Sequence, residues 1–387
     1  MITGLLLLSL ILMCGGGPSG EVLGFKYWED PGATKAYIVD GEAGRFTAFL
    51  YVLIFSGFAF YFGPELIVFT AGEMRNPRKN LPIAARRFFY RLVTFYVLGA
   101  LAIGIICNSN AEGLTSGSGN ADASPWVIAI RDSGIAVLDS VVNAGILTSA
   151  WSSGAHIEQR SKRGELWLTN HSLLGNSFLF MSSRSLYSLA ISGNAPQIFV
   201  KCNGYGLPIY AVGAACLFVP LAYLSLGSSA GTVFNYFISI TNTAGFLSWT
   251  VCCITMLRFR KACDTQNVQV PYRSRFQPIL SRICIGCFVS LLLLNGFTNF
   301  YTGNWSVSGF VTAYIGLPAF LLLWIGHKLI AGRSDPWMTP PAEIDLESKR
   351  AEVEADAQLW AAMDAKKAEM RGGKGPTWLK KVSVLWA

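Results

Sequence analysis

Residues 62–99 read FGPELIVFTAGEMRNPRKNLPIAARRFFYRLVTFYVLG and contain the pattern that decides the fold. They begin near the end of an apolar run at about residues 46–72 and finish inside another at about 89–107. The stretch between the two runs, residues 74–91, carries six Lys or Arg and no acid. Because a membrane-spanning helix needs about 20 apolar residues, the pattern predicts two spans joined by a basic loop.

Apolar runs of the same kind continue in both directions. One precedes this stretch at residues 1–14, and others follow near 134–153, 178–191, 208–226, 230–257, 279–299 and 308–330. Hydrophobic residues make up 52% of the chain and charged residues 14%, whereas soluble domains carry about 25% charged residues. A bilayer can absorb this much apolar surface and a soluble core cannot. We therefore expect an all-α, polytopic membrane helical bundle of about eight spans.

The formal charge of +8 could indicate a nucleic-acid partner, but the positions of the bases argue against one. Residues 74–91 and 258–282 each carry six Lys or Arg, while the short segments near 226–231 and 300–307 carry none. This alternation follows the positive-inside rule, which puts both basic segments, residues 184–202 and the C-terminal tail in the cytosol. We expect the lipid bilayer as a partner and no nucleic acid.

The sequence divides into a transmembrane domain at residues 1–332 and a cytosolic tail at 333–387. The tail is rich in helix formers and charges, and it is where we expect cytosolic trafficking or ubiquitin machinery to bind. Residues 155–175, AHIEQRSKRGELWLTNHSLLG, interrupt the transmembrane domain. A charged side chain at the centre of a bilayer costs about 2.5–3.5 kcal/mol, so this segment is an atypical insert.

No pattern in the sequence predicts an enzyme or a cofactor. The nine cysteines lack paired spacing, and most fall within or beside apolar runs, so we interpret them as small buried hydrophobes. Metal-ligand spacing, a nucleophile–base pair and a phosphate-binding loop are all missing from the sequence. We expect no catalytic residue, no metal and no cofactor.

Glu65 is the only ionisable residue inside the 46–72 run, and it follows Gly63 and Pro64. A carboxylate within a membrane is costly and usually faces a cavity or a partner. Pro64 removes a backbone donor and disfavours helix at Gly63, which predicts a broken helix. Transporters bind substrates at such breaks. The alternative is a proline kink in which Glu65 pairs with a neighbouring helix.

Aromatic residues precede this interruption at Phe60, Tyr61 and Phe62. An aromatic ring beside a broken helix could cover a bound side chain. Aromatic rings also pack without any role in binding, and that alternative stays open.

Polar side chains occur in two further apolar runs. Asn143 and Trp151 are eight residues apart, near the same face of one helix. Asn235, Ser239 and Asn242 follow the spacing i, i+4 and i+7 of another. A polar face inside an apolar helix indicates a cavity or a partner helix. The alternatives are hydrogen bonding between helices for Asn and Ser, and an interfacial anchor for Trp151.

Three stretches resemble the fungal (yeast-type) amino-acid transporter family of the amino acid–polyamine–organocation superfamily. The first is residues 62–99, with its G-x-E-L and N-P-R-x-x-x-P patterns. The second is SSRSLYSLAISGNAPQIFVKCNGYGLPIYAV at 182–212, and the third, weaker, is VFNYFISITNTAGFLSWTVCCITMLRFRKA at 233–262. The resemblance implies a pair of inverted five-helix repeats plus two further helices. It also implies that this chain corresponds to family helices five to twelve, with the first four absent.

The resemblance implies secondary active transport of an amino acid, coupled to protons, across a fungal plasma membrane. From the polar and aromatic positions above we predict a substrate-binding set: Phe60, Tyr61, Phe62, Gly63, Glu65, Asn143, Trp151 and Asn235. Two alternatives are an amino-acid sensor of permease fold without flux and an inert truncated fragment. In the family, SAWSSG would run directly into NSFLFMSSR, so residues 155–175 fit a retained intron or a gene-model error. A genuine insertion is the alternative.

Overall fold

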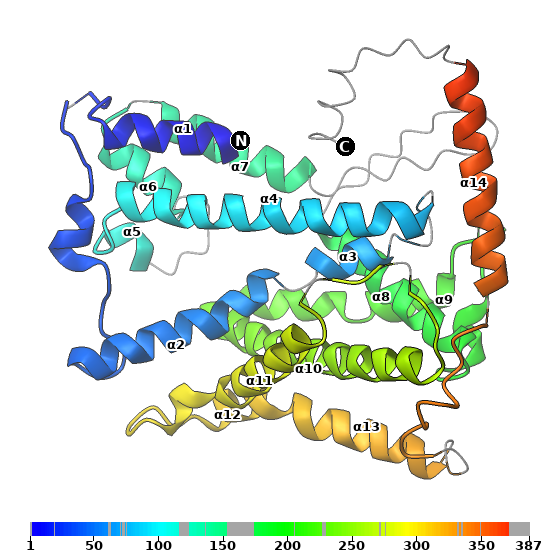
Figure 1. Cartoon of the computed structure of the whole chain (residues 1–387). Coiled ribbons are helices and arrows are strands. Elements are labelled where there is room, and N and C mark those ends of the chain that lie inside the picture. Colours follow the sequence, from blue (N-terminus) through cyan, green and yellow to red (C-terminus); the bar gives the residue numbers. More distant parts are fainter. Residues whose placement is uncertain are drawn as a thin grey trace. The chain divides into compact units, whose positions relative to one another are not determined.

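The computed structural model describes residues 2–18, 20–60, 63–69, 71, 74, 76–115, 124–135, 137–152, 174–204, 206–226, 230–270, 272–274, 276–330, 333, 336–348 and 350–370. Every regular element in these residues is helical, which confirms the all-α class. The α-helices follow one another as shown in Figure 1: α1 (Ile2–Met13), α2 (Gly41–Phe60), α3 (Gly63–Phe69), α4 (Pro77–Ile106), α5 (Glu112–Thr115), α6 (Pro125–Asp132), α7 (Leu138–Ser152), α8 (Leu174–Ile191), α9 (Ile209–Cys216), α10 (Ala230–Thr265), α11 (Ile279–Leu294), α12 (Val307–Tyr314), α13 (Gly316–Ile330) and α14 (Arg350–Met370).

Three helical stretches in the described residues are long and apolar enough to cross a membrane: Gly41–Phe69, Pro77–Ile106 and Gly231–Thr265. A fourth is formed by α12 and α13, which are bent by 42° at the break between them. Four shorter apolar helices complete the set: Ile2–Met13, Leu138–Thr148, Ile209–Leu221 and Ile279–Leu294. These eight segments follow the order of eight of the nine apolar runs in the sequence, and the remaining run, near 178–191, lies in α8.

Large apolar side chains cover much of the helix surface. Leu217, Leu322, Leu323 and Ile330 are 78%, 74%, 76% and 86% exposed, respectively. A protein in water would gain free energy by burying such side chains, whereas hydrocarbon tails cover them without cost. The exposed apolar surface therefore fits a protein that is solvated by lipid.

The basic segment at residues 74–91 is helical from Pro77 onward rather than a loop, so that expectation is wrong. Asn76 has a left-handed backbone with φ of 46°, and its carbonyl accepts hydrogen bonds from the amides of Lys79 and Asn80. Pro77 is then the first residue of α4, where its missing amide hydrogen costs nothing. The helix can begin in this segment because Arg and Lys are good helix formers at a water-facing end.

The chain forms two compact units. The first unit comprises Met1–Phe69, Phe88–Phe246 and Leu291–Pro318, and the second comprises Thr70–Arg87, Leu247–Ser290 and Ala319–Ala387. The predicted division at residue 333 separates membrane from cytosol. That is a different criterion from compactness, and the division stays a prediction.

An apolar core holds one end of the first unit. It combines Leu12 of α1, Ile105 and Ile106 at the end of α4, and Ile128 and Ala129 of α6, all of them buried. α1 therefore packs through one apolar stripe although its sequence is apolar on every side.

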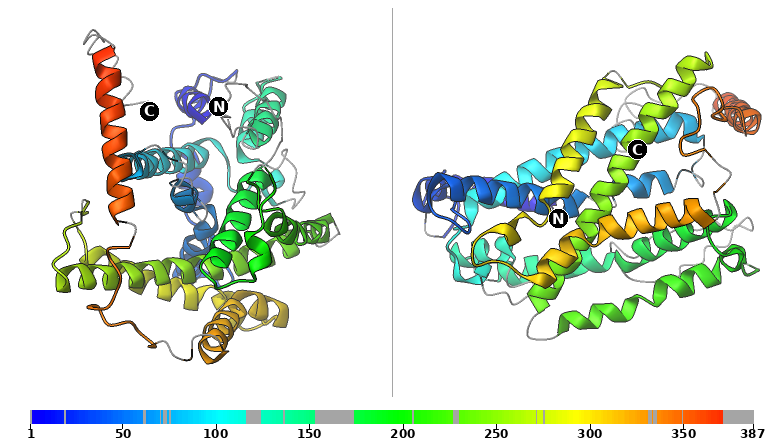
Figure 2. Two further views of the ribbon diagram at one scale, coloured as in Figure 1. Left: turned by 90° about the vertical axis from the view of Figure 1, so that its right-hand side faces the viewer. Right: turned by 90° about the horizontal axis from the view of Figure 1, so that it is seen from below.

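Within the second unit, the segment before α14 packs on the last turn of α10. The side-chain amide of Gln266 lies 2.9 Å from the carbonyl oxygen of Pro341 and 2.8 Å from that of Ile344. Asp345 then accepts hydrogen bonds from the amides of Glu347 and Ser348 and from the Ser348 hydroxyl. These bonds hold the turn that leads into α14, which is one continuous helix (red in Figure 2).

Candidate functional site

α2 and α10 contact each other around Asn242. This side chain is 3% exposed, and its amide nitrogen donates a hydrogen bond to the backbone carbonyl of Ile54 over 3.1 Å. Gly57 lies one turn further along α2, where a Cβ atom would stand 2.5 Å from the ring of Phe246. Only glycine permits this approach, so Gly57 and Asn242 together fix the contact between the two helices.

The carbonyl oxygen of Asn242, Oδ1, is also buried. It has no hydrogen-bond partner among the residues that the structure describes. A buried acceptor without a partner costs about 1–3 kcal/mol, and such groups are concentrated at strained or functional positions.

A second polar junction joins α10 to α12 and to the end of α11. The Thr243 hydroxyl lies 2.6 Å from the carbonyl oxygen of Ala313 and 3.0 Å from that of Ser239. The side-chain amide of Asn295 lies 2.8 Å from the Thr243 hydroxyl and 2.9 Å from the Ser239 carbonyl. Thr243 and Asn295 thus donate hydrogen bonds to the backbone carbonyl of Ala313, beside the break between α12 and α13.

The position of this junction explains why polar side chains are needed there. α12 ends at Tyr314 and α13 begins at Gly316, and Pro318 in the first turn of α13 has no amide hydrogen to donate. Carbonyls near such a break lose helical partners, and inside a membrane other protein groups must replace them. Thr243 and Asn295 supply these donors to Ala313.

Glu65 lies in the first turn of α3. The side chain is half-buried, and its Oε2 atom is shielded from solvent. The positive end of the helix dipole favours a carboxylate at this position. The expectation that Pro64 disfavours helix at Gly63 is wrong, because α3 begins at Gly63. Pro64 is its second residue, where its missing amide hydrogen is harmless.

Three contacts pack the helices around Glu65. A Cβ atom on Gly63 would stand 2.8 Å from the ring of Phe88 in α4, so glycine is required for this packing as well. The rings of Phe60 and Tyr96 lie 4.6 Å apart, and α3 also packs against α8. Tyr61 and Phe62 lie outside the described residues. Phe60, Gly63 and Glu65 therefore share one region of the first unit.

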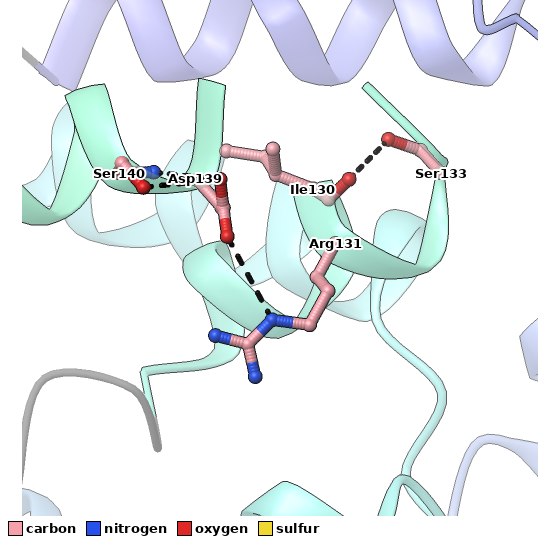
Figure 3. Close-up of polar contacts among 5 residues, drawn as sticks. All are labelled: Ile130, Arg131, Ser133, Asp139 and Ser140. Atoms are coloured by element: carbon pink, nitrogen blue, oxygen red, sulfur yellow. Dashed lines mark hydrogen bonds and ion pairs between the residues drawn. The ribbon is translucent and has the colours of Figure 1, made fainter. Parts of the chain in front are cut away.

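Asn143 is half-buried in α7, and an ion pair orients the start of that helix. Figure 3 shows Arg131 of α6 reaching Asp139, with 3.8 Å between Nε and Oδ2. The other carboxylate oxygen of Asp139 accepts a hydrogen bond from the amide of Ser140 over 2.8 Å. Asn143 follows Asp139 by one helical turn, so this corner sets the direction of its helix face.

The remaining predicted residues are less well connected. Trp151 belongs to α7, but its side chain lies outside the described part of the chain. Asn235 is exposed on α10, seven residues before Asn242. The structure thus brings together the residues around Glu65 and, separately, those around Asn242.

The sequence analysis misses three residues that hold α10 against its neighbours: Gly57, Thr243 and Asn295. Asn295 has one usable signal, since it ends the apolar run of α11 directly before Gly296. Thr243 and Gly57 have none, because their importance depends on which helices meet.

Apolar helices with exposed apolar surfaces, joined by buried polar contacts, define a polytopic helical membrane protein. A sequence model described as amino acid permease matches residues 1–157 and 167–339. The chain belongs to the amino acid permease family.

Curated relatives agree with this assignment. The chain is 41% identical over 359 residues to a proline-specific permease of Emericella nidulans, covering 91% of this chain and 61% of the relative. It is 41% identical over 367 residues to a probable proline-specific permease, put4, of Schizosaccharomyces pombe, covering 93% and 62%. It is 36% identical over 341 residues to a dicarboxylic amino acid permease of Saccharomyces cerevisiae, covering 85% and 52%.

The chain spans about three fifths of the length of its first curated relatives. No solved structure matches it. The family match leaves out residues 158–166, which fall inside the segment 155–175 that the sequence marks as atypical.

Proposed function

We propose that the full-length protein is a secondary active transporter that moves an amino acid across the plasma membrane together with protons. Family membership supports amino-acid transport, and a transporter needs no catalytic residue. Three relatives that are 40–41% identical carry proline-specific names, so we propose proline as the substrate.

One observation carries the proposal: buried polar side chains of α10 bind backbone atoms of α2 and α12 within a largely apolar bundle. Among these groups, the buried Asn242 Oδ1 has no hydrogen-bond partner within the described residues, which is costly in a purely structural helix contact. In a transporter, they line the place where helices separate to admit a polar solute.

Glu65, in the region that it shares with Phe60 and Gly63, is the proposed coupling group. It stands in the first turn of α3, the helix that follows α2. A carboxylate there can form an ion pair with the ammonium group of a substrate, or it can accept a proton. Loss or gain of one proton there changes the charge of the pathway. This links the proton gradient to the movement of the amino acid.

We propose the same substrate-contact set that the sequence predicts. Phe60, Gly63 and Glu65 form its best-supported part, because they share one packed region. Asn143 and Asn235 complete it from α7 and α10, and Tyr61, Phe62 and Trp151 are included on sequence grounds.

Two further proposals concern the rest of the chain. The omission of residues 158–166 from the family match supports an insert at 155–175, and sequencing the spliced transcript tests it. The docked segment before α14 supports a cytosolic tail that can present a surface to trafficking or ubiquitin machinery.

Uptake of radiolabelled proline by yeast that lacks its own permeases tests the function, with the full-length gene expressed from a plasmid. We expect uptake that unlabelled proline competes more strongly than glutamate or lysine, and that a protonophore abolishes. Proline binding without uptake would contradict transport and favour the sensor. Uptake that resists the protonophore would contradict proton coupling.

A further inference from the structure

A cavity of about 570 Å³ lies between the last turns of α10 and the first turn of α11. Four bases line it, Arg258, Arg260, Lys261 and Arg282, and only one acid, Asp264. We call it the basic cavity. All of its lining residues belong to the second compact unit, and none of them belongs to the candidate transport site.

The positive charge of the basic cavity is not neutralised by its own contacts. Asp264 forms an ion pair with Arg273, at 3.5 Å, rather than with a cavity base. The guanidinium of Arg258 donates to the carbonyl of Thr339, and that of Arg260 donates to Gln277 Oε1 over 3.1 Å. Both acceptors are uncharged. Within the described part of the chain, none of the four cavity bases forms a salt bridge.

Arg260 gives the second, independent indication of a ligand. Its Nη1 atom is shielded from solvent and has no hydrogen-bond partner among the described residues. A buried charged donor without an acceptor is more costly than a neutral one, because ionised groups lose the most on leaving water. Arg260 also lines the basic cavity, so an anion bound there would compensate the charge of this guanidinium.

The surroundings of the basic cavity select the kind of anion. The bases begin at Arg258, at the end of the apolar part of α10, and this is the depth at which phospholipid headgroups lie. Apolar side chains flank them: Ile254 is 42% exposed one turn before Arg258, and Ile279 and Ile283 are 64% and 57% exposed beside Arg282. A ligand with a phosphate group and hydrocarbon chains can contact both the cavity bases and the exposed isoleucines.

We propose that the basic cavity binds the headgroup phosphate of an anionic phospholipid from the adjacent leaflet. Arg260 and Arg282 hold the phosphate oxygens, since a guanidinium presents paired donors to phosphate. Lys261 adds charge, and the acyl chains lie along Ile279 and Ile283. The amino end of α11 faces the same cavity and contributes its positive dipole end.

Native mass spectrometry and thermal unfolding of the purified full chain test this proposal. The chain is placed in nanodiscs of phosphatidylcholine alone or with added phosphatidylserine. A third sample contains phosphatidylcholine and inorganic phosphate. The variants are Arg260→Gln, Arg282→Gln and the two combined. Arg86→Gln is the matched control. Arg86 is an exposed base of the other basic segment, residues 74–91, and it does not line the basic cavity.

We expect phosphatidylserine to remain bound and to raise the midpoint of unfolding of the wild-type chain. The double variant should lose affinity by about tenfold or more, since each base near a membrane surface contributes about fivefold. Arg86→Gln should keep the wild-type affinity. Arg282 is exposed, so Arg282→Gln reports on binding even when Arg260→Gln impairs folding.

Three results would overturn the proposal. One is equal retention of phosphatidylcholine and phosphatidylserine. Another is an equal loss of affinity in Arg86→Gln and in the double variant. The third is a shift with inorganic phosphate as large as that with phosphatidylserine, which would identify a free-phosphate site. Proline uptake plays no part in these measurements, so their failure is separate from failure of the transport proposal.

Discussion

The side-chain amide of Asn242 donates a hydrogen bond to the backbone carbonyl of Ile54, and this 3.1 Å contact ties the interior of α10 to α2. The two residues are 188 positions apart in the sequence. The contact therefore joins the span that leads to Glu65 with the helix that carries the polar junction at Ala313. A substitution that shifts α2 should therefore also shift α10, and the reverse should hold as well.

Asn242→Ala removes this bond and leaves a small cavity. We expect the free energy of unfolding to fall by about 1–3 kcal/mol, because a buried hydrogen bond and packed volume are both lost. Asn235→Ala, on the exposed face of the same helix, should change it by less than about 0.5 kcal/mol. Denaturant unfolding in detergent measures both, and equal losses would argue against a special role for Asn242.

Gly57→Ala should also destabilise the protein, since the new Cβ atom would stand 2.5 Å from the Phe246 ring. Overpacking of this kind costs about 1–3 kcal/mol. Gly99→Ala in α4 is the matched control: no atom lies within 4 Å of its Cβ position, so it should gain up to about 1 kcal/mol of helix propensity. Thermal unfolding compares the two, and a neutral Gly57→Ala would disprove the close α2–α10 contact.

Thr243→Val and Asn295→Ala should be coupled. Both side chains serve the carbonyl of Ala313 and bond to each other, so removing one weakens the other's contribution. A double-mutant cycle on the free energy of unfolding should give an interaction energy of about 0.5–3 kcal/mol. Strictly additive effects would show that the junction does not act as a unit.

The turn at Asp345 should depend on pH. Hydrogen bonds from the Ser348 side chain, and then from the amides of Ser348 and Glu347, lower the pKa of Asp345 from 3.8. A lowered folded-state pKa means that the charged form stabilises the turn above pH 3.8. This contribution is lost as the pH falls from 3.8 through the folded-state pKa.

Amide hydrogen exchange, corrected for the intrinsic rate at each pH, measures this effect. Protection of Glu347 and Ser348 should decrease across that acidic window. In Asp345→Asn the protection should be lower at neutral pH and flat across the window. The same pH response in the variant would assign the titration to another group.

The sequence predicts the helical spans well because each is set by a local property, the length of an apolar run. Its errors lie at the ends of helices. α4 begins at Pro77 and α10 continues to Thr265, because Arg and Lys extend a helix beyond the apolar part without penalty. Apolarity alone does not mark those ends.

The candidate site is predicted only in part, for a different reason. Glu65 and Asn242 are visible as polar residues in apolar runs. The partners of Asn242 and Thr243 are backbone carbonyls of Ile54 and Ala313, which any residue type would offer. Such contacts depend on the packing of distant helices and leave no local signal in the sequence.

The central claim is that Glu65 lies in the solute path of an amino-acid permease, and uptake of radiolabelled proline by the full-length Glu65→Gln variant tests it most directly. The control is Glu343→Gln, an exposed carboxylate of the tail. At equal amounts of protein in the plasma membrane, we expect uptake to fall by about tenfold or more in Glu65→Gln, since an intramembrane carboxylate is functional by default, and to be unchanged in Glu343→Gln. Wild-type uptake in Glu65→Gln would contradict the account.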